Sequence, residues 1–112
     1  MLEEDRLRLK EIALRVAEIQ QWTGGLDEQT FLADPKSMAA VTMNIMVIGE
    51  TARRLTHTVR DLEPTIPWSS IVNLRNRIAH SYESVDQGIV WRIVQEHIAA
   101  LDAAVSRMLA AP

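Results

Sequence analysis

Three side chains whose chemistry suits a phosphodiester lie within eight residues of this chain: Arg75, His80 and Tyr82. Arginine offers a rigid fork of donors that matches phosphate oxygens. Histidine has an unperturbed pKa of about 6.5, so it can give or take a proton near neutral pH. The pattern R-x-x-x-x-H-x-Y therefore predicts a site that binds phosphate and transfers protons, with Asn76 and Tyr82 as supporting groups.

The surrounding sequence predicts a helix, and helix geometry sets a problem for this site. At 3.6 residues per turn, Arg75 and His80 point about 140° apart, whereas Asn76 and His80 share one face. One regular helix would not aim both at one phosphate. Either the helix distorts or ends near His80, or a second copy of the protein completes the site. On spacing alone, the favoured interpretation is that Asn76, Arg77 and His80 form a solvated polar face and that Arg75 pairs with an acid.

A second group of charged residues lies on the preceding helix. Glu50 follows the apolar residues of that helix, where a carboxylate needs a partner. We expect an ion pair with Arg53 or Arg75, in which Glu50 orients the arginine. Gly49 predicts a point of close helix approach. His57 and His97 lack a motif or ligand-spaced carboxylates, so no metal site is predicted.

The elements that must position these residues are all helical. Apolar residues recur at spacings of three and four along four segments. Asp34 with Pro35 marks a helix start, and a short helical turn is expected at 27–31. The long helices are expected at 3–22, 35–59, 68–81 and 86–110. This predicts an antiparallel, up-down four-helix bundle with an extra short helix. The helix at 35–59 is apolar on two sides, so one side is expected to contact a second copy in a homodimer.

Composition limits the function further. The chain has 112 residues, no cysteine and a net charge of −3. The negative net charge argues against a protein that covers long stretches of nucleic acid by neutralising its phosphates. Between residues 50 and 82, however, the sequence contains five arginines and only three acidic residues. This local excess of positive charge suits the binding of a few phosphates. No secretory signal or membrane span is expected. We expect one domain, residues 1–112, in the cytoplasm.

Several short stretches together resemble one protein family. They are Phe31…Asp34, Ala40-Val41…Asn44, Ile48-Gly49-Glu50-Thr51-Ala52-Arg53, Ile66-Pro67-Trp68…Ile71, the octapeptide 75–82 and Val85-Asp86…Val90-Trp91. Their order and spacing are similar to those of HEPN-domain ribonucleases, in particular the HepT-like toxins that are paired with MNT-type nucleotidyltransferase antitoxins. The resemblance implies a HEPN-like fold and a homodimer in which two motifs face each other across a cleft. It also implies that the antitoxin can transfer AMP to Tyr82.

The residues and the resemblance together predict a metal-independent endoribonuclease, and the resemblance implies that it is the toxin of a type II or type VII toxin–antitoxin pair. RNA carries its own nucleophile, the 2′-hydroxyl, so the protein needs only proton transfer and charge stabilisation. His80 is expected to act as general base or acid, and Arg75 to stabilise the transition state. Asn76 would orient His80 or a phosphate oxygen. The alternative is a non-enzymatic helical module that binds a nucleotide or a nucleotidyltransferase through the same residues and regulates it.

Overall fold

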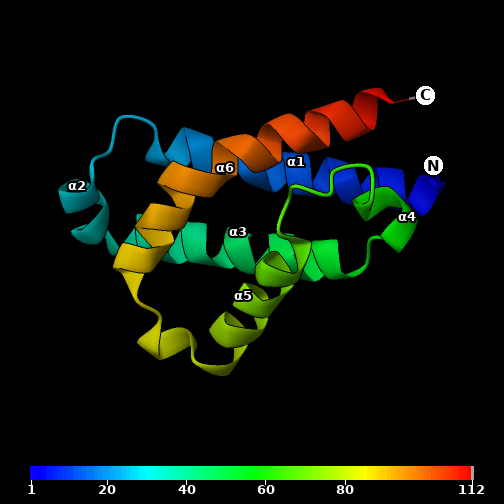
Figure 1. The fold of residues 1–112 in the computed structure, drawn as a ribbon. Helices are drawn as coiled ribbons and strands as arrows, with labels where there is room; N and C mark the ends of the chain where they lie inside the picture. Colours follow the sequence, from blue (N-terminus) through cyan, green and yellow to red (C-terminus); the bar gives the residue numbers. More distant parts are fainter. Residues whose placement is uncertain (112) are drawn as a thin grey trace.

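The computed structural model describes residues 1–111, which form helices and no strands (Figure 1). The predicted all-α class is confirmed. The long helices are α1 (Glu3–Thr23), α3 (Pro35–Arg53), α5 (Trp68–His80) and α6 (Gln87–Ala110). Short helices α2 (Glu28–Leu32) and α4 (His57–Arg60) and the 3₁₀ helix η1 (Tyr82–Ser84) connect them. No helix of residues 1–111 is both long and apolar enough to cross a membrane.

Side-chain caps fix where several helices begin. The Asp34 carboxylate accepts from the backbone N–H of Ser37, and Pro35 occupies the first turn of α3, as predicted. Asp27 and Thr30 form a reciprocal capping box at the start of α2. Each cap satisfies N–H groups that have no partner within the helix. The cap residues therefore fix the residue at which each of these helices begins.

The predicted helix at 35–59 is wrong beyond Arg53, where α3 ends and a separate short helix, α4, follows. The break is made by Asp5 of α1, whose buried carboxylate accepts from Thr56 N at 3.1 Å and Thr56 Oγ1 at 2.7 Å. Thr56 in turn caps α4. At the end of α3, Arg60 Nη2 donates to the carbonyls of residues 52 and 53 at 2.8 and 2.9 Å. The freed helix ends are thus satisfied by side chains.

Helix α3 packs against α1 on one side and α5 on another, and α1 also packs along α6 (Figure 1). Figure 1 shows the two chain ends at the same end of the molecule, where Arg6 Nη1 donates to the Leu109 carbonyl at 3.3 Å. Short helix α2 covers the other end, with Phe31 fully buried and its ring centroid 5.1 Å from that of Trp91. The core lies between these helices and is lined by Leu9, Ile12, Val16, Ile19, Val41, Ile45, Ile48, Val94, Ile98, Leu101 and Val105.

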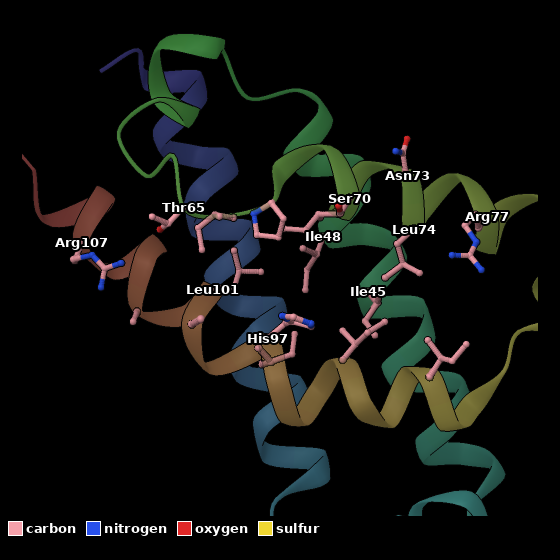
Figure 2. Close-up of a pocket in the computed structure, with 18 residues that line it drawn as sticks. Ile45, Ile48, Thr65, Ser70, Asn73, Leu74, Arg77, His97, Leu101 and Arg107 are labelled. Atoms are coloured by element: carbon pink, nitrogen blue, oxygen red, sulfur yellow. The ribbon is translucent and has the colours of Figure 1, made fainter.

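Helices α5 and α6 leave an open groove of about 910 Å³ between them (Figure 2). Its walls are mainly aliphatic, with Ile45 and Ile48 of α3 among them. On α3, Met43 is 46% exposed, so part of the second apolar side expected for this helix lies at the surface. Within residues 1–111, apolar surface along α3, α5 and α6 is therefore left uncovered.

Candidate active site

Helix α5 carries the residues predicted to do chemistry, and it is anchored at its first residue. The Trp68 ring is buried, and its Nε1 donates to the carbonyls of Arg60 and Glu63 at 3.2 and 3.1 Å. At the other end, α5 finishes at His80 because Ser81 leaves the helical region, with φ −143° and ψ 45°. The helix thus ends within one residue of its predicted end. Ile78 is buried, and Arg75, three residues earlier, contacts Gly49 and Glu50 of α3.

Helices α3 and α5 approach each other closely at Gly49, as predicted. A Cβ at this position would overlap the Cβ of Arg75 and lie 2.9 Å from the carbonyl oxygen of Ile71. Only glycine leaves room for the backbone of α5 here. Because of this approach, the stem of Arg75 runs directly over α3, and its guanidinium reaches the residue that follows Gly49.

That residue, Glu50, is surrounded by three guanidinium groups. Its Oε1 lies 2.7 Å from Arg53 Nη2 and 3.4 Å from Arg54 Nη2, and its Oε2 lies 3.1 Å from Arg75 Nε. The predicted ion pair is confirmed with both named partners, Arg53 and Arg75. The hydrogen bond from Arg53 is the main cause that lowers the pKa of Glu50; partial burial opposes it, and the three positive charges add to it.

Arg75 is held from two sides. Its Nη1 donates to Asn76 Oδ1 at 3.1 Å. Its buried Nε is close to Glu50 Oε2 but is not aligned for a hydrogen bond with any described residue, so that contact is an ion pair. The guanidinium keeps Nη2 and part of Nη1 for another ligand, and its side chain is 34% exposed. This arrangement fixes Arg75 without consuming all of its donors.

His80 lies in a different surface region, an open cleft of about 460 Å³ between the end of α5, η1 and the start of α6. The imidazole is exposed. Asn76 and Arg77 line this cleft together with His80, and Arg75 does not. This distribution agrees with the divergence expected from helix geometry. Asn76 links the two regions because it contacts Arg75 and also lines the His80 cleft.

Tyr82 stands in η1 and is 45% exposed. Tyr82 comes seven residues after Arg75, and on one continuous helix the two side chains would share a face. Because α5 ends at His80, this relation does not determine where the phenol lies. A tyrosine that only packed the third long helix against the fourth would be buried, and the exposure of Tyr82 argues against that role. The phenol is open to solvent, and Tyr82 is not one of the residues that line the His80 cleft, although Ser81 and Ser84 on either side of it are.

Sequence reasoning missed one residue of the cleft. Arg77 was assigned only to a polar helix face, yet it lines both the His80 cleft and the large groove. Its spacing of three from His80 was a usable signal, since residues three apart in a helix are neighbours. His97 lies on the wall of the large groove, and His57 starts α4. Within residues 1–111, no three His, Asp or Glu side chains come together as metal ligands.

Comparison with known proteins gives one consistent family. The profile of the family described as "Ribonuclease HepT-like" matches residues 12–108. A "probable ribonuclease HepT" of Thermococcus cleftensis is 31% identical over 93 residues, which cover 83% of this chain and 84% of that protein. A "putative RNase" of Methanocaldococcus jannaschii is 30% identical over 81 residues, 72% of this chain and 74% of that protein. No solved structure matches the chain.

The family match spans both the Glu50 cluster on α3 and the whole of α5 with His80. It also includes η1 and nearly all of α6, so it covers every wall of the cleft. On this match and the two relatives, the chain belongs to the ribonuclease HepT-like family.

Proposed function

We propose that this protein is a metal-independent endoribonuclease. The observation that carries the proposal is the exposed His80 in a cleft with Asn76 and Arg77, in a chain of a ribonuclease family. RNA supplies the 2′-hydroxyl as nucleophile, so a positioned imidazole can take its proton or protonate the leaving 5′-oxygen. Arg75 stabilises the negative charge that builds on the phosphate in the transition state. DNA lacks the 2′-hydroxyl and should not be cleaved.

We propose further that the active form is a homodimer. Arg75 and His80 of one protomer lie in different regions, so one copy does not offer both to the same phosphate. A two-fold related copy would bring a second motif, and two imidazoles would supply an acid and a base. The uncovered groove between α5 and α6 and the exposed Met43 support a contact of this kind. Light scattering should give twice the protomer mass of 12.6 kDa.

The cellular role that fits this activity is that of a toxin with an MNT-type nucleotidyltransferase antitoxin. The exposed phenol of Tyr82 suits an acceptor for AMP. An added AMP brings negative charge and bulk beside residues that RNA needs, so it would inhibit by charge and by steric exclusion. Mass spectrometry after co-expression with the antitoxin should find AMP on Tyr82 and none on a Tyr82→Phe variant. Equal neutralisation of that variant would show that inhibition works by binding alone.

The cleavage proposal is tested with purified protein and a labelled single-stranded RNA in the presence of EDTA. Products should carry 2′,3′-cyclic phosphate and 5′-hydroxyl ends. His80→Ala should lower the rate by about 10²–10⁴, and His57→Ala, a histidine on α4, is the matched control and should match the unsubstituted protein. Loss of activity in EDTA, or full activity of His80→Ala, would refute the mechanism. No cleavage together with tight binding to a nucleotidyltransferase would favour the regulatory module instead.

A further inference from the structure

Arg77 differs from most arginines of this protein in having no partner. Within residues 1–111 it makes no ion pair and no side-chain hydrogen bond, whereas Arg75 is held by Glu50 and Asn76. The other arginines with carboxylate or carbonyl acceptors are Arg6, Arg8, Arg15, Arg53, Arg54, Arg60 and Arg107. Arg77 is exposed and its positive charge is uncompensated. It therefore keeps all its donors for a ligand.

The uncompensated charge of Arg77 lies at the His80 cleft. Arg77 and His80 are three residues apart on α5 and line the same cleft, and side chains at this spacing have Cβ atoms about 5–6 Å apart. Figure 2 shows the Arg77 side chain at one end of the large groove, and Arg77 lines both this groove and the cleft. The carboxylate that also lines the cleft, Asp86, accepts from the backbone N–H groups of Gly88 and Ile89 at 2.9 and 3.3 Å. It is thus engaged as the cap of α6.

We propose that Arg77 is a phosphate-binding residue of the His80 cleft, which holds the RNA backbone in the same protomer as the imidazole. This inference rests on the proposed ribonuclease function. Two arginines then have separate tasks: Arg75, fixed by Glu50, acts on the scissile phosphate, and Arg77 binds a neighbouring phosphate. The fork of the guanidinium suits two phosphate oxygens. Arg77 would raise affinity and fix register, with little effect on the chemical step.

The chain offers a matched control in Arg92. It is exposed, makes no ion pair or side-chain hydrogen bond within residues 1–111, and lies on α6 outside the walls of both the cleft and the groove. Arg77→Gln and Arg92→Gln remove the same charge from the same kind of side chain. Any general effect of net charge on RNA binding appears equally in both variants. A difference in RNA affinity between the two variants therefore reports a direct contact of Arg77 with RNA.

Binding is measured by fluorescence anisotropy with a single-stranded RNA at several salt concentrations, in a His80→Ala background that prevents cleavage. Arg77→Gln should weaken binding about 10-fold or more, as for a lost charged hydrogen bond. The slope of log K against log salt, which is negative, should also become less negative by about 0.7, the value for one phosphate contact on a single strand. Arg92→Gln should change neither quantity. In the cleaving protein, Arg77→Gln should raise KM far more than it lowers kcat.

The outcomes separate this inference from the proposed function. If the protein cleaves RNA and the two glutamine variants behave alike, the Arg77 contact is refuted and the ribonuclease stands. If RNA binds through Arg77 but is not cleaved, the nuclease proposal fails and the contact stands. If RNA is neither bound nor cleaved, both are refuted. A changed molecular mass of Arg77→Gln in light scattering would assign Arg77 to a protein interface and would also overturn the inference.

Discussion

Replacing Gly49 by alanine tests the contact on which the position of Arg75 depends. The new Cβ would overlap Arg75 Cβ and lie 2.9 Å from the carbonyl oxygen of Ile71 and 3.3 Å from Arg75 Cγ. Two of these neighbours are a backbone atom and an atom one bond from the backbone, so rotation of a side chain does not relieve them. Helices α3 and α5 must move apart.

The required movement sets the magnitude. Ordinary van der Waals contact is at about 3.5 Å, so α5 must shift by roughly 0.6 Å at Ile71 and by more at Arg75. Overpacking of this kind costs about 1–3 kcal/mol. Alanine returns up to about 1 kcal/mol through its higher helix propensity. A net loss of about 1–2 kcal/mol is expected, which lowers the Tm by about 5–10 °C for a domain of this size.

The assay is thermal unfolding followed by circular dichroism, with RNA cleavage measured below the transition. Gly88→Ala is the control, because a Cβ there meets only the Asp86 carboxylate, at 3.1 Å, near the start of α6. Its Tm should change by less than that of Gly49→Ala. Cleavage by folded Gly49→Ala should also fall, since the guanidinium is displaced from Glu50. A Gly49→Ala protein as stable as Gly88→Ala would refute the close approach of α3 and α5.

Three further results are expected. Asp5→Ala should lower the free energy of unfolding in urea by about 2–3 kcal/mol, because Thr56 loses its buried acceptor; unchanged stability would contradict this role. The arginines lower the pKa of Glu50 from 4.5, so its ion pairs stabilise the fold above pH 4.5 and are lost as the pH falls through the lowered value. Unfolding of Glu50→Gln should therefore depend less on pH in that acid range, and an identical dependence would count against the pairs. Phe31→Ala should cost about 3–5 kcal/mol in urea, and a loss below 1 kcal/mol would refute its place in the core.

Much of the helix pattern could be predicted because the signals are local. The cap at Asp34 and the glycine pair Gly24-Gly25 after α1 act within a few residues. The end of α1 and the start of α3 both lie within one residue of their predicted positions. The break after Arg53 could not be predicted in this way. Leu55 and Val59 continue the apolar spacing and are buried, and the group that interrupts the helix, Asp5, comes from 51 residues away.

In the candidate site, too, the features with local signals could be predicted and those that depend on the path of the chain could not. The close approach at Gly49 and the ion pairs of Glu50 were predicted from a glycine and a carboxylate that follow the apolar residues of the helix. The different directions of Arg75 and His80 were predicted from ideal helix geometry. Arg77 was missed because its importance depends on which residues line the cleft. That depends on the path of the chain from Ser81 to the start of α6, a turn that carries no periodic pattern.

The pairing of α1 with α6 has a consequence for the order in which the protein folds. The hydrogen bond between Arg6 and Leu109 closes a loop of 103 residues, whereas Gly49 and Arg75 are only 26 positions apart (75 − 49). Loop-closure entropy grows as 1.5RT ln n, so joining the chain ends costs about 1.2 kcal/mol more than joining α3 to α5. We expect α3 and α5 to meet first, which pairs Glu50 with Arg75 early. The walls that α6 contributes to the His80 cleft would then be added last, so the ion pair between Glu50 and Arg75 would form before the cleft is complete.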